Sequence, residues 1–137
     1  MKQTFDLNFS GYFGKERLSE LPEESGIYAV FRGVQDRRTF KWLSFTLLYI
    51  GQASDLRERL TGHEGWSAWE RRAGLGSSTV VSYAPLPKTN LDRVEAALIF
   101  CNQPMLNSTL KDNFNYHETT VRTSGNRGTI RETNNAG

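Results

Sequence analysis

Glu95 is the residue whose type and surroundings most clearly indicate chemistry. It is the only charged residue between Val94 and Cys101, in a run that is otherwise apolar. A buried carboxylate without a partner is unstable by an amount on the order of several kcal/mol, so it needs a metal ion, an arginine or an exit to water. One carboxylate completed by waters and a substrate phosphate suits Mg²⁺, which keeps much of its hydration shell. Glu95 is therefore a candidate metal ligand, and pairing with an arginine is the alternative.

Arg59 and His63 form a second candidate group. Residues 54–55 have the types that begin a helix, a capping side chain followed by an acid. On that helix Arg59 and His63 lie four residues apart and are expected to project side by side, whereas Arg57 points elsewhere. The spacing favours Arg59 as the functional arginine and leaves Arg57 in solvent.

Several elements are needed to position these side chains. Runs rich in β-branched and aromatic residues predict strands at residues 27–31, 39–50 and 78–83, the first two as an antiparallel hairpin. Helices are predicted after residue 55, at residues 66–72 and at residues 91–101. We expect an α+β domain at residues 25–110, with a small antiparallel sheet of about three strands flanked by helices. Residues 1–24 are expected to be an N-terminal extension, and residues 111–137 a C-terminal extension with a frayed end.

Two tripeptides in this framework, Gly26-Ile27-Tyr28 and Tyr49-Ile50-Gly51, are those that name the GIY-YIG nuclease family. The chain resembles that family from about residue 25 to residue 108. The stretch from Gly51 to Arg59 resembles the family's path into its first helix, and it places the family's arginine at Arg59. The resemblance also matches His63 to a His-or-Tyr position, Glu95 to the metal-binding glutamate and Asn107 to the asparagine of a P-x-x-N context.

The resemblance implies a metal-dependent endonuclease that hydrolyses DNA phosphodiesters with one Mg²⁺ or Mn²⁺ ion. Its site would comprise Tyr28, Tyr49, Arg59, His63, Glu95 and Asn107. Glu95 would hold the metal and Arg59 would neutralise charge on the phosphate. A tyrosinate would accept the proton of the attacking water, for which we favour Tyr49, with Tyr28 as a phosphate or water ligand. His63 would relay that proton or orient the tyrosine, and Asn107 would fix the local backbone or the geometry of Glu95.

Two features depart from the pattern of the family. Twenty residues separate Tyr28 from Tyr49, about twice the spacing in compact members, and a long hairpin explains them most simply. Gln52 stands where some relatives, such as the incision subunit of bacterial excision repair, have a lysine; other relatives lack that lysine.

Taken one at a time, the same residues have plainer interpretations. Strand tyrosines are most often core aromatics, Arg59 can pair along its own helix, and His63 suits a helix C-terminus. Asn107 is a typical turn residue, and the pair Trp66 and Trp69 indicates packing. A catalytically silent nucleic-acid-binding module with this fold is the second hypothesis. A purely structural interaction domain is the third, and it leaves Glu95 unexplained.

Composition and charge fit a soluble globular protein with a phosphate-bearing partner. The 137 residues are 37% hydrophobic and 23% charged, with a net charge of +2. Residues 1–31 carry 3 basic and 5 acidic side chains, whereas residues 32–137 carry 14 and 10. Within the predicted hairpin we expect four cations to bind the DNA backbone: Arg32, Arg37, Arg38 and Lys41.

Localisation and further partners are predicted from what the sequence lacks. No signal peptide or apolar run of membrane-spanning length is present, which indicates a cytoplasmic protein without a membrane partner. Without a separate DNA-binding domain, specificity is expected to come from the domain's own loops, a homo-oligomer or a partner protein.

Overall fold

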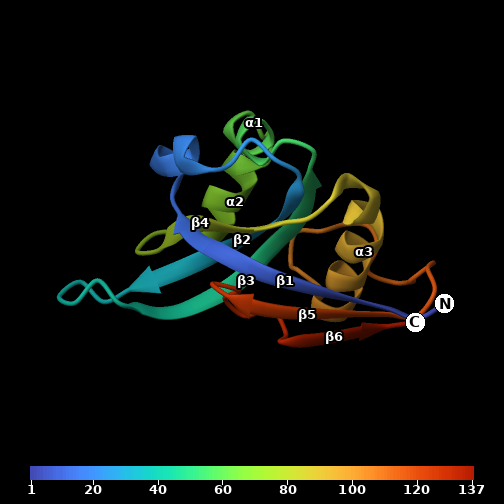
Figure 1. Ribbon diagram of the computed structural model, residues 1–137. Helices are drawn as coiled ribbons and strands as arrows, with labels where there is room; N and C mark the ends of the chain where they lie inside the picture. The colour runs from blue at the N-terminus through green and yellow to red at the C-terminus, as the bar shows by residue number, and fades with distance from the viewer.

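The computed structural model describes residues 1–137 and contains one mixed sheet with helices on both faces. The strands are β1 (Gln3–Phe13), β2 (Gly26–Gln35), β3 (Trp42–Ala53), β4 (Ser78–Pro85), β5 (Thr119–Gly125) and β6 (Thr133–Ala136). The helices are α1 (Leu56–Thr61), α2 (Trp66–Ala73) and α3 (Leu91–Asn102), with short 3-10 helices η1 (Lys15–Glu20) and η2 (Lys88–Asn90). Figure 1 shows their arrangement, which confirms the α+β class.

The predicted hairpin and third strand form one half of the sheet. β2 pairs with β3 in antiparallel fashion from Gly26↔Ala53 to Gln35↔Trp42. On its other side β2 pairs with β4, also antiparallel. β3 is the outermost strand on this side, because the six strands are ordered β3-β2-β4-β1-β5-β6.

The expectation of three strands was wrong, because both flanking segments contribute to the same sheet. β1, from the predicted N-terminal extension, lies between β4 and β5. It pairs with β5 in parallel from Gln3↔Thr119 to Phe9↔Gly125. The C-terminal end, predicted to be frayed, is β6, which pairs with β5. Phe5, Leu7 and Phe9 of β1 are buried at alternate positions, but their partner strand follows more than a hundred residues later.

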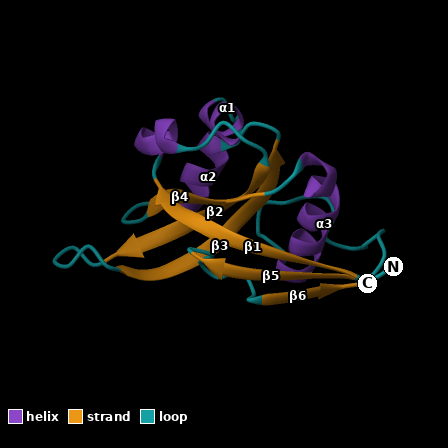
Figure 2. Ribbon diagram, in the orientation of Figure 1, coloured by secondary structure: helices purple, strands orange, loops and turns teal.

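Helices cover the two faces of the sheet separately. One hydrophobic core includes Ile27 and residues of α3, and the other includes Tyr28 and residues of α1 and α2. In Figure 2, α1 and α2 lie together and α3 stands apart from them. Ile27 and Tyr28 are neighbours on β2 and therefore point to opposite faces. The tyrosine side of the sheet thus faces α1 and α2. No helix in this fold has the length and apolarity that a membrane crossing requires.

The β2–β3 hairpin ends in a turn, residues 36–41, that projects from the body of the molecule (Figure 1). Asp36 Oδ1 accepts hydrogen bonds from the backbone N–H groups of Arg38 at 2.7 Å and Thr39 at 3.0 Å. The Asp36 N–H donates to the Lys41 carbonyl at 2.8 Å. These bonds order the turn from within.

Candidate active site

The glycines of the two tripeptides lie where the chain packs too closely for a Cβ. A Cβ at Gly51, which pairs with Tyr28 across β2 and β3, would overlap the Tyr28 ring. A Cβ at Gly26 would overlap the Ala84 carbonyl of β4. Tyr28 is consequently packed to 1% exposure. Gly51 is therefore required by the Tyr28 ring, and Gly26 by the close approach of β4 and Leu56.

Tyr49 lies on the same face as Tyr28, because it is two residues before Gly51, which pairs with Tyr28, and a β-bulge follows directly after the Val30–Tyr49 pair. Val30 pairs with Tyr49, whereas Phe31 pairs with Leu47, so Leu48 is an extra residue in β3. Leu47 belongs to the core under α3, while Leu48 and Tyr49 pack in the core under α1 and α2. In a regular strand, positions 47 and 49 would share a face. The bulge reverses this, as bulges beside functional sites commonly do.

His63 lies against both tyrosines. Its ring centroid is 6.0 Å from that of Tyr28, 5.9 Å from that of Tyr49 and 4.4 Å from Trp69. His63 Nδ1 accepts a hydrogen bond from the Gly65 N–H at 2.7 Å, so the hydrogen of the neutral ring is on Nε2. That Nε2 is buried and has no hydrogen-bond partner. A buried donor left unpaired costs about 1–3 kcal/mol, which favours a ligand or water there.

The prediction that His63 lies on the same helix as Arg59 is wrong. α1 ends at Thr61, Gly62 is its C-cap, and His63 lies beyond the helix. The residue reaches the tyrosines because the chain turns after Gly62, not because it shares a helical face with Arg59. Burial lowers the pKa of the His63 imidazole, and the nearby Arg59 cation lowers this pKa further.

The two arginines of α1 have different partners. Arg59 pairs with Glu64 through two hydrogen bonds, of 3.1 Å and 3.2 Å. Arg57 points away, donating from Nε to the Leu21 carbonyl at 2.8 Å and pairing with Glu23. The prediction that Arg57 is simply solvated is wrong, because its guanidinium ties α1 to the segment after η1. Glu64 had no signal in the sequence, since the chain bends between the two residues.

Glu95 is half-buried on α3 and contacts an amide of β3. Gln52 Nε2 donates to Glu95 Oε1 at 2.9 Å and to Asp92 Oδ1 at 2.8 Å. Asp92 was missed as a neighbour of Glu95, although it lies one turn before Glu95 on the same helical face and the spacing was a usable signal. Burial raises the pKa of the Glu95 carboxyl, partly offset by the Gln52 hydrogen bond.

A cleft of about 370 Å³ opens between the end of β3 and α1. Both Gln52, which holds Glu95, and Arg59 line this cleft. An anion in the cleft would therefore meet the guanidinium of Arg59 near the only half-buried carboxylate of α3.

The electrostatic environment distinguishes the two tyrosines. Burial raises the pKa of the Tyr28 hydroxyl well above its usual range, and Tyr49 raises it further. Burial also raises the pKa of Tyr49, as does the negative charge of Glu95, while the Arg59 cation lowers the pKa of both tyrosines. Tyr49 is only half-buried, so it is the tyrosine that solvent can reach.

The donor set around Glu95 fits a hydrated divalent cation. No group of three or more His, Cys, Asp or Glu side chains gathers in the molecule to enclose a metal ion. Glu95 Oε2, in contrast, accepts no hydrogen bond from the protein and is not buried. One half-buried carboxylate with a free oxygen matches the way proteins hold Mg²⁺, with water completing the coordination.

Asn107 hydrogen-bonds to the backbone of Ile50, the middle residue of the tripeptide Tyr49-Ile50-Gly51. Its Oδ1 accepts from the Ile50 N–H and its Nδ2 donates to the Ile50 carbonyl, both at 2.9 Å. Leu106 N–H donates to the Leu48 carbonyl at 2.8 Å. The segment therefore closes the free edge of β3 beside the bulge. Of the two roles expected for Asn107, the structure shows contact with the local backbone and none with Glu95.

We expect Asn107→Ala to lower the free energy of unfolding by about 2–4 kcal/mol, because it leaves a buried donor and a buried acceptor of Ile50 unpaired. Urea denaturation followed by fluorescence measures this loss. Asn113→Ala, at an exposed asparagine without side-chain hydrogen bonds, is the matched control. Equal stability of the two variants would contradict the assigned hydrogen bonds.

The four cations expected to bind DNA do not form one group. Arg37, Arg38 and Lys41 are exposed in the hairpin turn. Arg32 is not, because its Nε donates to the Ala73 carbonyl at the end of α2 at 2.8 Å. Arg32 is therefore corrected from a DNA contact to a brace between β2 and α2.

Comparisons with known proteins point to one kind of relative. The chain is 31% identical over 103 residues to the UvrABC system protein C of Natronomonas pharaonis, and 29% identical over 103 residues to that of Haloarcula marismortui. Each match covers 74% of this chain but only 16% of the relative, so the chain spans a small part of their length. No protein-family model and no solved structure matches the chain.

Proposed function

We propose that this chain is a GIY-YIG endonuclease that hydrolyses DNA phosphodiester bonds with one divalent metal ion, Mg²⁺ or Mn²⁺. One observation carries the proposal: Tyr28, Tyr49 and His63 pack against one another on one face of the sheet, near the cleft that Arg59 and Gln52 line. The resemblance of the two tripeptides to that family supports it. The similarity to UvrABC system protein C of two archaeal organisms agrees with it.

Arg59 and Glu95 are assigned to the scissile phosphate. Arg59 leaves Glu64 and donates to the phosphoryl oxygens, where its charge stabilises the transition state. Glu95 would hold the divalent cation, while Gln52 fixes one oxygen of its carboxylate and leaves the other free. The bound cation supplies positive charge at the phosphate and at the leaving 3′ oxygen.

Tyr49 is assigned as the base that accepts a proton from the attacking water. It is half-buried, so water reaches its hydroxyl, and the Arg59 cation favours its ionised form. Tyr28 was expected to bind phosphate or water, but its 1% exposure leaves no access for either. We assign to Tyr28 the positioning of Arg59, whose cation lies near enough to lower the tyrosine pKa.

His63 is assigned to orientation rather than to proton relay. Because Nδ1 is occupied by the Gly65 N–H, the ring has no free acceptor for a proton. Its Nε2–H is free to donate to the attacking water or to the Tyr49 oxygen. Asn107 keeps Tyr49 and Gly51 in place through Ile50.

A plasmid-nicking assay with and without Mg²⁺ or Mn²⁺ tests this function. The proposal requires conversion of supercoiled plasmid to nicked or linear forms only when metal is present. Plasmid retarded in a gel but not cut would support the second hypothesis, a silent DNA-binding module. Neither binding nor cutting would leave a structural interaction domain.

A further inference from the structure

Exposed basic side chains without acidic partners lie in the β2–β3 turn and at the end of α2, where Arg72 also contacts Met105. Arg37, Arg38 and Lys41 lie in the β2–β3 turn, and Arg71 and Arg72 lie in the last turn of α2. None of the five belongs to an ion pair within the chain. Asp36, the acid of the hairpin turn, is engaged by backbone N–H groups. This end of the molecule therefore presents more positive charge than the carboxylate of Asp36 balances.

The same surface carries apolar side chains that nothing in the fold covers. Phe40, at the tip of the hairpin, is 72% exposed, and Leu43 beside it is 63% exposed. Leu75, in the turn between α2 and β4, is fully exposed. The turns lie at the same end of the sheet, because Gly33 pairs with Ser78. A large aromatic residue surrounded by cations suits a nucleic acid, whose phosphates lie on the outside and whose flat bases lie on the inside.

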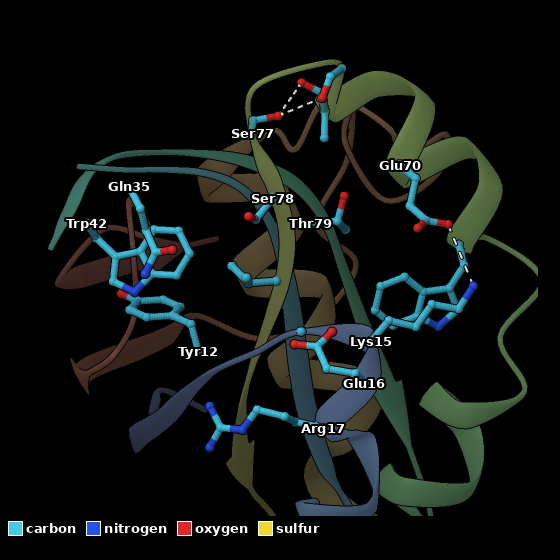
Figure 3. Close-up of a pocket in the computed structure, with 15 residues that line it drawn as sticks. Tyr12, Lys15, Glu16, Arg17, Gln35, Trp42, Glu70, Ser77, Ser78 and Thr79 are labelled. Carbon is cyan, nitrogen blue, oxygen red and sulfur yellow. Dashed lines mark hydrogen bonds and ion pairs between the residues drawn. The ribbon is translucent and has the colours of Figure 1, made fainter. Parts of the chain in front are cut away.

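A cavity of about 500 Å³ lies between the base of the hairpin, η1 and α2, and charged side chains of η1 and α2 also line it, including Glu16 and Glu70 (Figure 3). Tyr12, Gln35 and Trp42 lie along one wall, and Ser78 and Thr79 lie between them and α2. Aromatic rings with amide and hydroxyl groups are the groups that receive an unstacked base in nucleic-acid-binding proteins. Arg32 fixes the spacing between β2 and the end of α2 that bounds the cavity.

The separation of this end from the active site suits one DNA duplex. Tyr28 and Gln35 are seven residues apart on β2. At about 3.3 Å per residue this is roughly 23 Å, and the turn adds to it. The distance along β2 is about two-thirds of one turn of B-DNA, which is about 34 Å. A single duplex can therefore contact both surfaces.

We propose that this end of the sheet is a second DNA-binding surface that recognises duplexes with unpaired bases, with Phe40 as the wedge and the cavity as the receptor of a displaced base. The inference rests on the proposed function, because it names the substrate class of that nuclease. The cations contact phosphates on both sides of the distortion. A pre-formed bulge is favoured because it spares the protein the cost of unstacking a base pair.

Binding of a 30-base-pair duplex with a central two-nucleotide bulge, compared with the fully paired duplex, tests the inference. Fluorescence anisotropy is measured in EDTA, so binding is observed without cleavage. We expect the bulged duplex to bind roughly ten-fold more tightly, and Phe40→Ala to abolish that preference. Tyr116→Ala, at an exposed aromatic residue near the start of β5, is the matched control and should keep it.

The triple variant Arg37→Ala, Arg38→Ala and Lys41→Ala should weaken binding to both duplexes. It should also flatten the slope of log affinity against log salt by about one unit for each phosphate that the variant no longer neutralises. The control is the triple alanine variant at Lys2, Lys88 and Arg131, which are exposed elsewhere on the molecule. Thermal melting of each variant establishes that the fold is retained.

The outcomes distinguish a failure of the second DNA-binding surface from a failure of the proposed nuclease activity. Equal affinity of the wild type for bulged and paired DNA, or a bulge preference unaffected by Phe40→Ala, overturns the inference. Binding to phosphatidylserine vesicles that requires Phe40, without a preference among DNAs, also overturns it. Nicking of plasmid by a protein without the bulge preference overturns the surface and retains the nuclease. A Phe40-dependent preference for bulged DNA in a protein that never cuts DNA retains the second surface and overturns the nuclease.

Discussion

Glu95→Gln should abolish metal-dependent cleavage of DNA while leaving DNA binding largely intact. The amide keeps the volume of the side chain and its contact with Gln52, but it removes the charge that holds the cation. We expect a fall in the single-turnover rate on the order of 10³-fold or more, as for removal of a principal electrostatic interaction with the transition state. Measurement at several Mg²⁺ concentrations distinguishes reduced metal affinity from impaired chemistry, since only reduced affinity is rescued by excess metal.

The control for Glu95→Gln is the same chemical change at Glu24, an exposed carboxylate without side-chain hydrogen bonds. Glu24→Gln should cut at the rate of the wild type. Full activity of Glu95→Gln would remove this carboxylate from the mechanism. Because burial raises the pKa of Glu95, the neutral amide should also fold at least as stably as the wild type.

Arg59→Ala should lower the cleavage rate by about 10²–10³-fold, as expected when a charge that stabilises a transition state is removed. Arg57→Ala should change the rate far less, because its guanidinium contacts the Leu21 carbonyl and Glu23 instead of the cleft. Its effect should appear in the melting temperature. Equal losses of rate in the two variants, or the reverse order, would contradict the separation of their roles.

A substitution at Glu64 should have a favourable effect at the same site, because it should tighten DNA binding. The Glu64 carboxylate occupies the guanidinium of Arg59, and that cation lowers the pKa of Glu64 to about 2, so Glu64 is ionised wherever the nuclease would work. A DNA phosphate that binds Arg59 must displace the Glu64 carboxylate. The pair is exposed, so the competition is weak, and Glu64→Gln should tighten DNA binding by roughly two- to five-fold. Weaker binding by this variant would show that Glu64 holds Arg59 in its productive position.

The chain's local pattern predicted the central elements. Alternation and β-branched content located the β2–β3 hairpin and β4, and apolar periodicity located α3, because these signals depend on neighbouring residues. β1 escaped prediction as part of the sheet, since its parallel pairing with β5 joins the two ends of the chain. A strand whose partner is so remote has no turn signal between the two.

The sequence by itself determined which residue types were available to the candidate site: two strand tyrosines, an arginine, a histidine, an apolar-helix glutamate and an asparagine. Only the tertiary structure decided how these groups meet. The register of β2 against β3 sets Tyr49 beside Tyr28, and His63 reaches both rings only because the chain turns after Gly62. The contacts Gln52–Glu95, Asn107–Ile50 and Arg59–Glu64 were likewise decided there, because hydrogen bonds across elements depend on packing and not on spacing along the chain.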